Sequence, residues 1–185
     1  MDKALQELLD KQAIGELVHN YSRAVDRKDW ALLRDLYTKD GVDDHAALFC
    51  GPADDFVKWL EGATAHLDGM AHHVHSILIG VDGDAAWGEA YVTSYNRWPD
   101  GKGGFEEFVQ GLRYLDTYRR EGDKWRFVYR KVMVDYAYKQ PAWFDFTDPL
   151  LAGKRPGRFG DGDPSYSDLK HPAFGDGIGV KPVHD

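Results

Sequence analysis

The hydrophobic period of this chain changes near residue 72, and no other feature constrains its fold as strongly. Before that point apolar residues recur at steps of three and four, which is the period of a helix with one buried face. Beyond it apolar and polar residues alternate, which is the period of half-buried strands. We expect helices over residues 3–26, 29–37 and 54–66, a short extended segment over 42–49, and strands over 74–81, 85–95, 105–120 and 125–138.

Tight turns connect the later strands, among them Asp82-Gly83 and Glu121-Gly122-Asp123. Consecutive strands joined in this way form an antiparallel meander, and helices that precede a meander pack on one of its faces. The sequence therefore predicts the α+β class. A curved, mainly antiparallel sheet would wrap around N-terminal helices and could leave a conical cavity.

The composition changes beyond residue 139. Six of the eight prolines and many of the glycines lie in the last 46 residues. We therefore predict one α+β domain over residues 1–139 and an irregular, Pro/Gly-rich C-terminal extension over residues 140–185. Trp143, Phe144 and Phe146 suggest that the first part of this extension is anchored by packing.

Charge and composition exclude several classes of protein. The formal net charge is −8 and the pI is about 5.4, which speaks against nucleic acid or an anionic membrane as a partner. No apolar run approaches the ~18 residues of a membrane span, and the N-terminus does not look like a secretory signal, so we expect a cytoplasmic protein. Cys50 is the one cysteine and is expected to be a small core residue. The pair Arg119-Arg120 is expected to be a solvated strand end.

Asp26 stands near the end of the apolar stripe of the first helix, where a carboxylate has no evident structural role. Three histidines, His72, His73 and His75, stand where the first long strand begins. A carboxylate that accepts from one ring nitrogen fixes the tautomer of the imidazole and raises its basicity. We therefore predict that Asp26 pairs with one of these histidines in a pocket; the alternative is a solvated residue at a helix end.

Strand alternation alone does not select His72. It places His73 and His75 on the face of Ile77 and Ile79, which is the face richer in large aliphatic residues. A β-bulge at the start of the strand would instead bring His72 to the packed face. The His73-Val74-His75 motif also lacks the glutamate that a His-x-His metal site needs, so no metal site is predicted.

The order of the elements and four short motifs resemble a known family. The motifs are residues 24–30 around Asp26, residues 71–76 around the histidines, the turn 82–85, and residues 123–127. They are similar to the SnoaL-like branch of the nuclear transport factor 2-like superfamily, which has the cystatin-like α+β barrel fold. The resemblance covers about residues 5–139. Within this branch the chain is most similar to two enzyme types, scytalone dehydratase and hexachlorocyclohexane dehydrochlorinase.

The resemblance implies a cofactor-independent enzyme with an Asp–His pair. By spacing, Asp26 matches the acidic member and His72 the histidine, with His73 as the second choice. Arg130 matches a functional arginine of the dehydrochlorinase; the alternative is a surface arginine on an edge strand. Tyr21 stands where that enzyme has a catalytic lysine, so dehalogenation is not expected. Tyr21, His73 and Arg130 are expected to contact the substrate.

The resulting expectation is a dehydratase-like lyase or isomerase that needs no cofactor. It would act on a small hydrophobic, cyclic or aromatic substrate by Asp–His acid–base proton transfer. The same fold also serves non-catalytic ligand-binding or assembly subunits and polyketide cyclases, so these remain alternatives. The resemblance further implies a homo-oligomer, a dimer or a trimer; the negative net charge speaks against a nucleic acid or membrane partner.

Overall fold

The computed structural model describes residues 2–142, 148–151, 153–171 and 175–176. The chain divides into two compact units, residues 1–143 and 144–185, and each is described by itself. Trp143, Phe144 and Phe146, which we expected to anchor the extension, lie outside the described residues.

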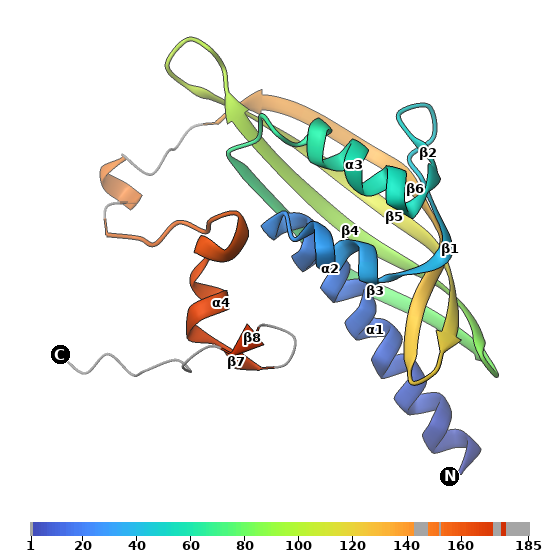
Figure 1. The fold of residues 1–185 in the computed structure, drawn as a ribbon. Helices are drawn as coiled ribbons and strands as arrows, with labels where there is room; N and C mark the ends of the chain where they lie inside the picture. The colour runs from blue at the N-terminus through green and yellow to red at the C-terminus, as the bar shows by residue number, and fades with distance from the viewer. Residues whose placement is uncertain (1, 143–147, 152, 172–174, 177–185) are drawn as a thin grey trace. The chain divides into compact units, whose positions relative to one another are not determined.

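The first unit contains three helices and six strands (Figure 1). In chain order they are α1 (Lys3–Arg27), α2 (Trp30–Asp35), β1 (Tyr37–Asp44), β2 (Cys50–Pro52), α3 (Ala53–Ala63), β3 (Gly69–Asp82), β4 (Ala85–Pro99), β5 (Phe105–Glu121) and β6 (Lys124–Pro141). The second unit contains short elements, which are the 3₁₀ turns η1 (Pro149–Leu151) and η2 (Gly160–Gly162), α4 (Pro164–Asp168), β7 (Lys170–His171) and β8 (Gly175–Asp176).

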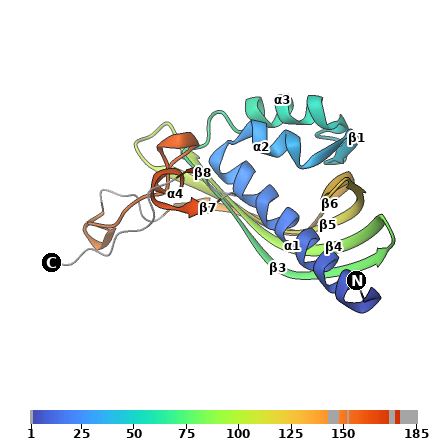
Figure 2. The ribbon, with the colours of Figure 1, turned by 60° about the horizontal axis from the view of Figure 1, so that its bottom comes forward.

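The six strands of the first unit form one open sheet in the order β2-β1-β6-β5-β4-β3. Neighbouring strands are antiparallel except for β1 and β6, which are parallel. The sheet is curved, and α1, α2 and α3 lie on one side of it (Figure 2). The predicted α+β class, with N-terminal helices packed on a curved and mainly antiparallel sheet, is therefore confirmed.

Helix α1 runs unbroken through Gly15. It ends at Lys28, which has a left-handed backbone with φ 54° and whose N–H bonds the carbonyls of Ala24 and Val25. The carboxylate of Asp29 then accepts from the N–H of Leu32 at 3.0 Å and caps the second helix. This sharp junction fixes the direction in which the end of α1, and with it Asp26, faces the sheet.

Two local predictions are wrong. The second helix, expected over residues 29–37, ends at Asp35, because the chain enters β1 at Tyr37 directly after α2. Cys50, expected in the core, is exposed in the short edge strand β2. In both cases pairing along β1 overrides the local turn and burial preferences.

The core lies between α1, α2, α3 and the concave face of the sheet. Its fully buried apolar residues include Ile14 and Val18 of α1, Leu33 of α2, Phe56 of α3 and Phe127 of β6. These residues come from every layer of the first unit, so the helices are fixed to the sheet by shared burial rather than by their own propensity.

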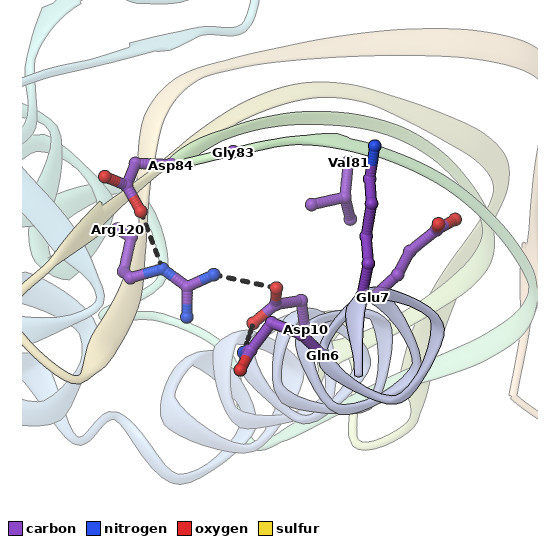
Figure 3. A pocket seen from close by; sticks show the side chains of 8 residues that line it. Gln6, Glu7, Asp10, Val81, Gly83, Asp84 and Arg120 are labelled. Atoms are coloured by element: carbon purple, nitrogen blue, oxygen red, sulfur yellow. Dashed lines mark hydrogen bonds and ion pairs between the residues drawn. The ribbon is translucent and has the colours of Figure 1, made fainter. Parts of the chain in front are cut away.

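A buried carboxylate ties the N-terminal half of α1 to the sheet (Figure 3). Asp10 accepts from Nη2 of Arg120 at 2.7 Å, from Nε1 of Trp125 at 3.2 Å and from Nε2 of Gln6 at 3.0 Å. Arg120 also donates from Nε to Asp84 at 2.9 Å and lies over the ring of Trp125. Arg120, whose side chain is 22% exposed, is therefore a structural residue, and its expected role as a solvated strand end is wrong.

Replacing Asp10 by Asn should lower the free energy of unfolding by about 1–3 kcal/mol, because a charged acceptor of three donors is lost. Hydrogen bonding from Arg120 is the main cause that holds the pKa of Asp10 below its usual value. The stability that the Asp10 carboxylate contributes is therefore fully present above its unfolded-state pKa of about 3.9. It is lost as the pH falls through the lower pKa of the folded state. Urea unfolding should be measured at a series of pH values from 7 downward. The difference in the free energy of unfolding between wild type and Asp10→Asn should stay constant at first and shrink below about pH 4.

The matched control is Asp84→Asn, which removes the exposed carboxylate partner of the same arginine. A solvated ion pair contributes little, so this variant should unfold within about 0.5 kcal/mol of the wild type. Equal losses for the two variants would contradict the assignment of Asp10 as the buried tie.

Candidate active site

A cavity of about 670 Å³ opens between the concave face of the sheet and the helices. Its walls are mainly apolar and aromatic, with Trp59 from α3, Met70 from β3, and Phe108 and Leu112 from β5. A few polar groups interrupt this lining. This combination of size and lining is typical of sites for small organic molecules.

Asp26 and His72 meet at the wall of this cavity. Nδ1 of His72 lies 2.6 Å from Oδ1 of Asp26, and the backbone N–H of His72 donates to Oδ2 at 2.8 Å. The Asp26 side chain is 13% exposed and that of His72 is 10% exposed. His72 lines the large cavity, whereas Asp26 approaches it from a smaller pocket on the α1 side. The two contacts fix both the position and the rotation of the carboxylate.

A β-bulge decides which histidine faces the helices. Along β3, Val74 pairs with Val92 and Ile77 pairs with Ala90, so β3 carries one extra residue at this point. Before the bulge Met70 and His72 face the cavity; beyond it the odd-numbered residues, such as Ile77, are the less exposed ones. The predicted alternation therefore holds on each side of the bulge but changes face across it.

His73 and His75 do not line the cavity. Both are exposed, and Nε2 of His75 lies 2.8 Å from the hydroxyl of Thr93 on the neighbouring strand β4. The structure thus brings one histidine of the cluster to the carboxylate and leaves the other two outside.

Two tyrosines add neutral donors to the cavity wall. Tyr21 of α1 and Tyr114 of β5 both line it and pack edge to face, with ring centroids 5.7 Å apart. Burial raises the pKa of each phenol above its usual value, by a large margin for Tyr21. Both hydroxyls therefore stay protonated near neutral pH and can donate to an oxygen of a bound molecule.

Arg130 lies behind these tyrosines and is not among the residues that line the cavity. It is fully buried on β6, and its Nε and Nη2 atoms form a fork onto Asp116 at 2.8 and 2.7 Å. Its guanidinium lies 4.0 Å from the ring centroid of Tyr21 and 4.1 Å from that of Tyr114. Because β6 lies between β1 and β5, the alternative of a surface arginine on an edge strand is wrong.

Burial opposes the charge of Arg130, but the carboxylate of Asp116 outweighs this cost and raises the pKa above its usual value. The arginine therefore remains a cation beneath two aromatic faces. Its position allows it to hold the rings of Tyr21 and Tyr114 in place.

Sequence reasoning did not single out His45, which also lines the cavity. It follows β1, two residues after the buried Asp43, and the signal was present in the spacing: residues i and i+2 of a strand share a face. Short polar segments next to a turn are usually solvated, so the pattern gave no reason to place this pair inside.

No group of three or more His, Cys, Asp or Glu side chains is arranged to hold a metal ion in the part of the chain that the structure describes. Within the same residues, no helix is long and apolar enough to cross a membrane.

Comparison with known proteins identifies the family. A model of the SnoaL-like domain matches residues 6–131. An uncharacterized protein of Mycobacterium tuberculosis is 27% identical over 129 residues, which cover 69% of this chain and 86% of the relative.

Solved structures share the fold. A candidate scytalone dehydratase from Novosphingobium aromaticivorans is similar with a TM-score of 0.64 and 23% identity, over 71% of this chain and 87% of that one. A hexachlorocyclohexane dehydrochlorinase from Novosphingobium barchaimii gives a TM-score of 0.66 and 18% identity, over 80% of this chain and 100% of that one. The family match spans more than half of the chain and agrees with the curved sheet and its cavity, so this protein belongs to the SnoaL-like domain family.

Proposed function

We propose that this protein is a cofactor-independent lyase or isomerase of the dehydratase type that acts on a small cyclic or aromatic molecule. The observation that carries the proposal is the contact between Asp26 and His72 at the wall of a largely apolar cavity. Structural neighbours named as a dehydratase and a dehydrochlorinase add support, because both names describe elimination reactions.

In this proposal His72 is the base. Asp26 binds Nδ1–H, which leaves the lone pair of Nε2 free to take a proton from a carbon next to a carbonyl group. Tyr21 and Tyr114 donate to the carbonyl oxygen, where negative charge develops. Arg130 acts on the reaction by positioning these two tyrosines rather than by touching the substrate. Such a base typically accelerates proton transfer by about 10²–10⁴.

The test uses 5-nitrobenzisoxazole, a small flat molecule that reports on a base in an apolar pocket. The base removes the proton on carbon, the N–O bond breaks, and a coloured nitrophenolate forms, so no cofactor is needed. We expect the wild type to open the ring with saturation kinetics. His72→Ala should lower kcat by about 10²-fold or more, because the positioned base is lost.

His73→Ala is the matched control, since His73 is the exposed neighbour of His72 on the same strand. It should turn over like the wild type. Binding of the probe without ring opening, or equal rates for wild type and His72→Ala, would contradict the catalytic proposal and favour a non-catalytic ligand-binding role.

A further inference from the structure

A second carboxylate–imidazole pair borders the same cavity. Asp43 of β1 is fully buried, and its Oδ1 lies 2.6 Å from Nδ1 of His45. Its other oxygen, Oδ2, accepts from the hydroxyl of Tyr37 at 2.5 Å. The carboxylate thus binds Nδ1 of His45 in the way that Asp26 binds Nδ1 of His72, and Nε2 is the nitrogen left for other partners.

A buried cation lies beside Asp43 on the adjacent strand. The register of β1 and β6 places Asp43 opposite Arg130, the buried cation that also binds Asp116 from the other side. A buried carboxylate needs such compensation, and here a cation lies on the adjacent strand. Asp43 is therefore suited to orient the imidazole of His45 and to fix its tautomer.

The backbone around His45 is held by hydrogen bonds on both sides. The N–H of His45 donates to the carbonyl of Phe49 at 2.7 Å, and the N–H of Ala46 donates to Asp44 at 2.8 Å. Ala46 has a left-handed backbone with φ 54°, which is unfavourable for a residue with a side chain. The turn therefore holds Ala46 in an unfavourable backbone conformation and places His45 at the cavity wall.

Apolar rings frame His45. Its imidazole stacks on Phe56 with ring centroids 5.3 Å apart and lies 5.5 Å from Trp59, both from α3. The side chain still keeps 21% of its surface exposed, and its Nε2 makes no hydrogen bond within the described part of the chain. A histidine that served packing alone would not need a fully buried carboxylate to orient it.

His45, which follows β1, and His72 of β3 line the same cavity from different strands of the sheet. Strands β6, β5 and β4 lie between β1 and β3, and adjacent strands are about 4.8 Å apart. The two imidazoles therefore reach a molecule in the cavity from different positions along the sheet.

We propose that His45 is a second acid–base group of this cavity, which protonates the leaving atom while His72 removes the proton from carbon. This inference rests on the proposed function. In the elimination the electrons of the C–H bond form the new double bond, and the C–O bond breaks. The leaving oxygen takes a proton from Nε2 of His45, so that water departs. Proton exchange with solvent then returns both imidazoles to their starting states.

Two probes that differ in their leaving group test this assignment. The nitrophenolate released from 5-nitrobenzisoxazole needs little protonation, whereas the phenolate released from unsubstituted 1,2-benzisoxazole needs more. In His45→Asn the amide can still donate to Asp43, but the group that corresponds to Nε2 is gone. This variant should lose about 10²-fold in kcat on the unsubstituted compound and only about twofold on the nitro compound.

His75→Asn makes the same substitution at an exposed site and should leave both rates unchanged. Equal rates of wild type and His45→Asn on both probes would overturn the role of His45 while leaving the proposed function intact. If His72→Ala matches the wild type on both probes, the proposed function fails first, and this inference fails with it.

A measurement on the wild type keeps the test decisive if His45→Asn does not fold. Titration of protein carrying ¹⁵N-labelled histidine with 2-hydroxybenzonitrile, the product of the unsubstituted probe, should shift the ring signals of His72 and His45 together. A saturable shift at His72 with none at His45 would show that His45 does not reach the bound ring, and would overturn the inference.

Discussion

Asp26→Asn is expected to reduce ring opening of 5-nitrobenzisoxazole by about 10²–10⁴ in kcat, with little change in KM. The reason lies in the two hydrogen bonds of this carboxylate. If the amide oxygen of the asparagine still accepts the hydrogen bond from the backbone N–H of His72, its NH₂ group must face Nδ1. Nδ1 then has to accept, so the ring proton moves to Nε2. The imidazole keeps its position but loses the lone pair that makes it a base.

Asp55→Asn is a suitable control for this change, because it makes the same substitution at an exposed site of α3. It should retain wild-type kcat. ¹⁵N spectra of the histidine rings provide a direct check, since Asp26→Asn should shift the proton of His72 from Nδ1 to Nε2. Full activity of Asp26→Asn, together with an unchanged tautomer, would contradict the role given to Asp26.

Arg130→Met is expected to cause the largest loss of stability, about 3–5 kcal/mol, because it leaves a buried carboxylate without its cation. Asp116 accepts both arms of the guanidinium and has no exposed surface in its side chain. Asp43, opposite Arg130 on β1, loses its neighbouring charge as well. Removal of the arginine should therefore cost more than Asp116→Asn, which leaves the cation near Asp43.

Urea unfolding of the single variants and of the double variant Arg130→Met/Asp116→Asn would measure this coupling. The double variant should be more stable than the sum of the two single losses predicts. Arg113→Met is the control, because Arg113 forms exposed ion pairs with Asp135 and Glu89 on the same sheet. A surface network of this kind should contribute much less. An equal loss for Arg113→Met and Arg130→Met would contradict the argument from burial.

The sequence located the pair at the candidate site, but its alternation and the family resemblance pointed to different histidines, the resemblance to His72. Alternation favoured His73 or His75 over His72, because it placed them on the face richer in large aliphatic residues. The bulge between Val74 and Ile77 reverses this choice. A bulge depends on how two strands pair over their whole length, and such pairing has no signature in the local period.

Arg130 and His45 show a different limit. Arg130 stands in an alternating strand, where the sequence allows either face and either an edge or a central position. The parallel pairing of β1 with β6 puts it at the centre and brings Asp43 opposite to it. That pairing joins segments about ninety residues apart, so neither the burial of Arg130 nor the inward position of His45 could be read from nearby residues.

The sequence by itself determined the α+β class, the helices followed by a meander, and the two segments from which Asp26 and a histidine come. Hydrophobic periods carry this information because each element must bury one face. Tertiary structure decided between the histidines in favour of His72, and it alone placed Arg130 behind the tyrosines and joined Asp43 and His45 as a second pair. These features depend on strand register and on compensation of buried charge, which arise when distant segments pack together.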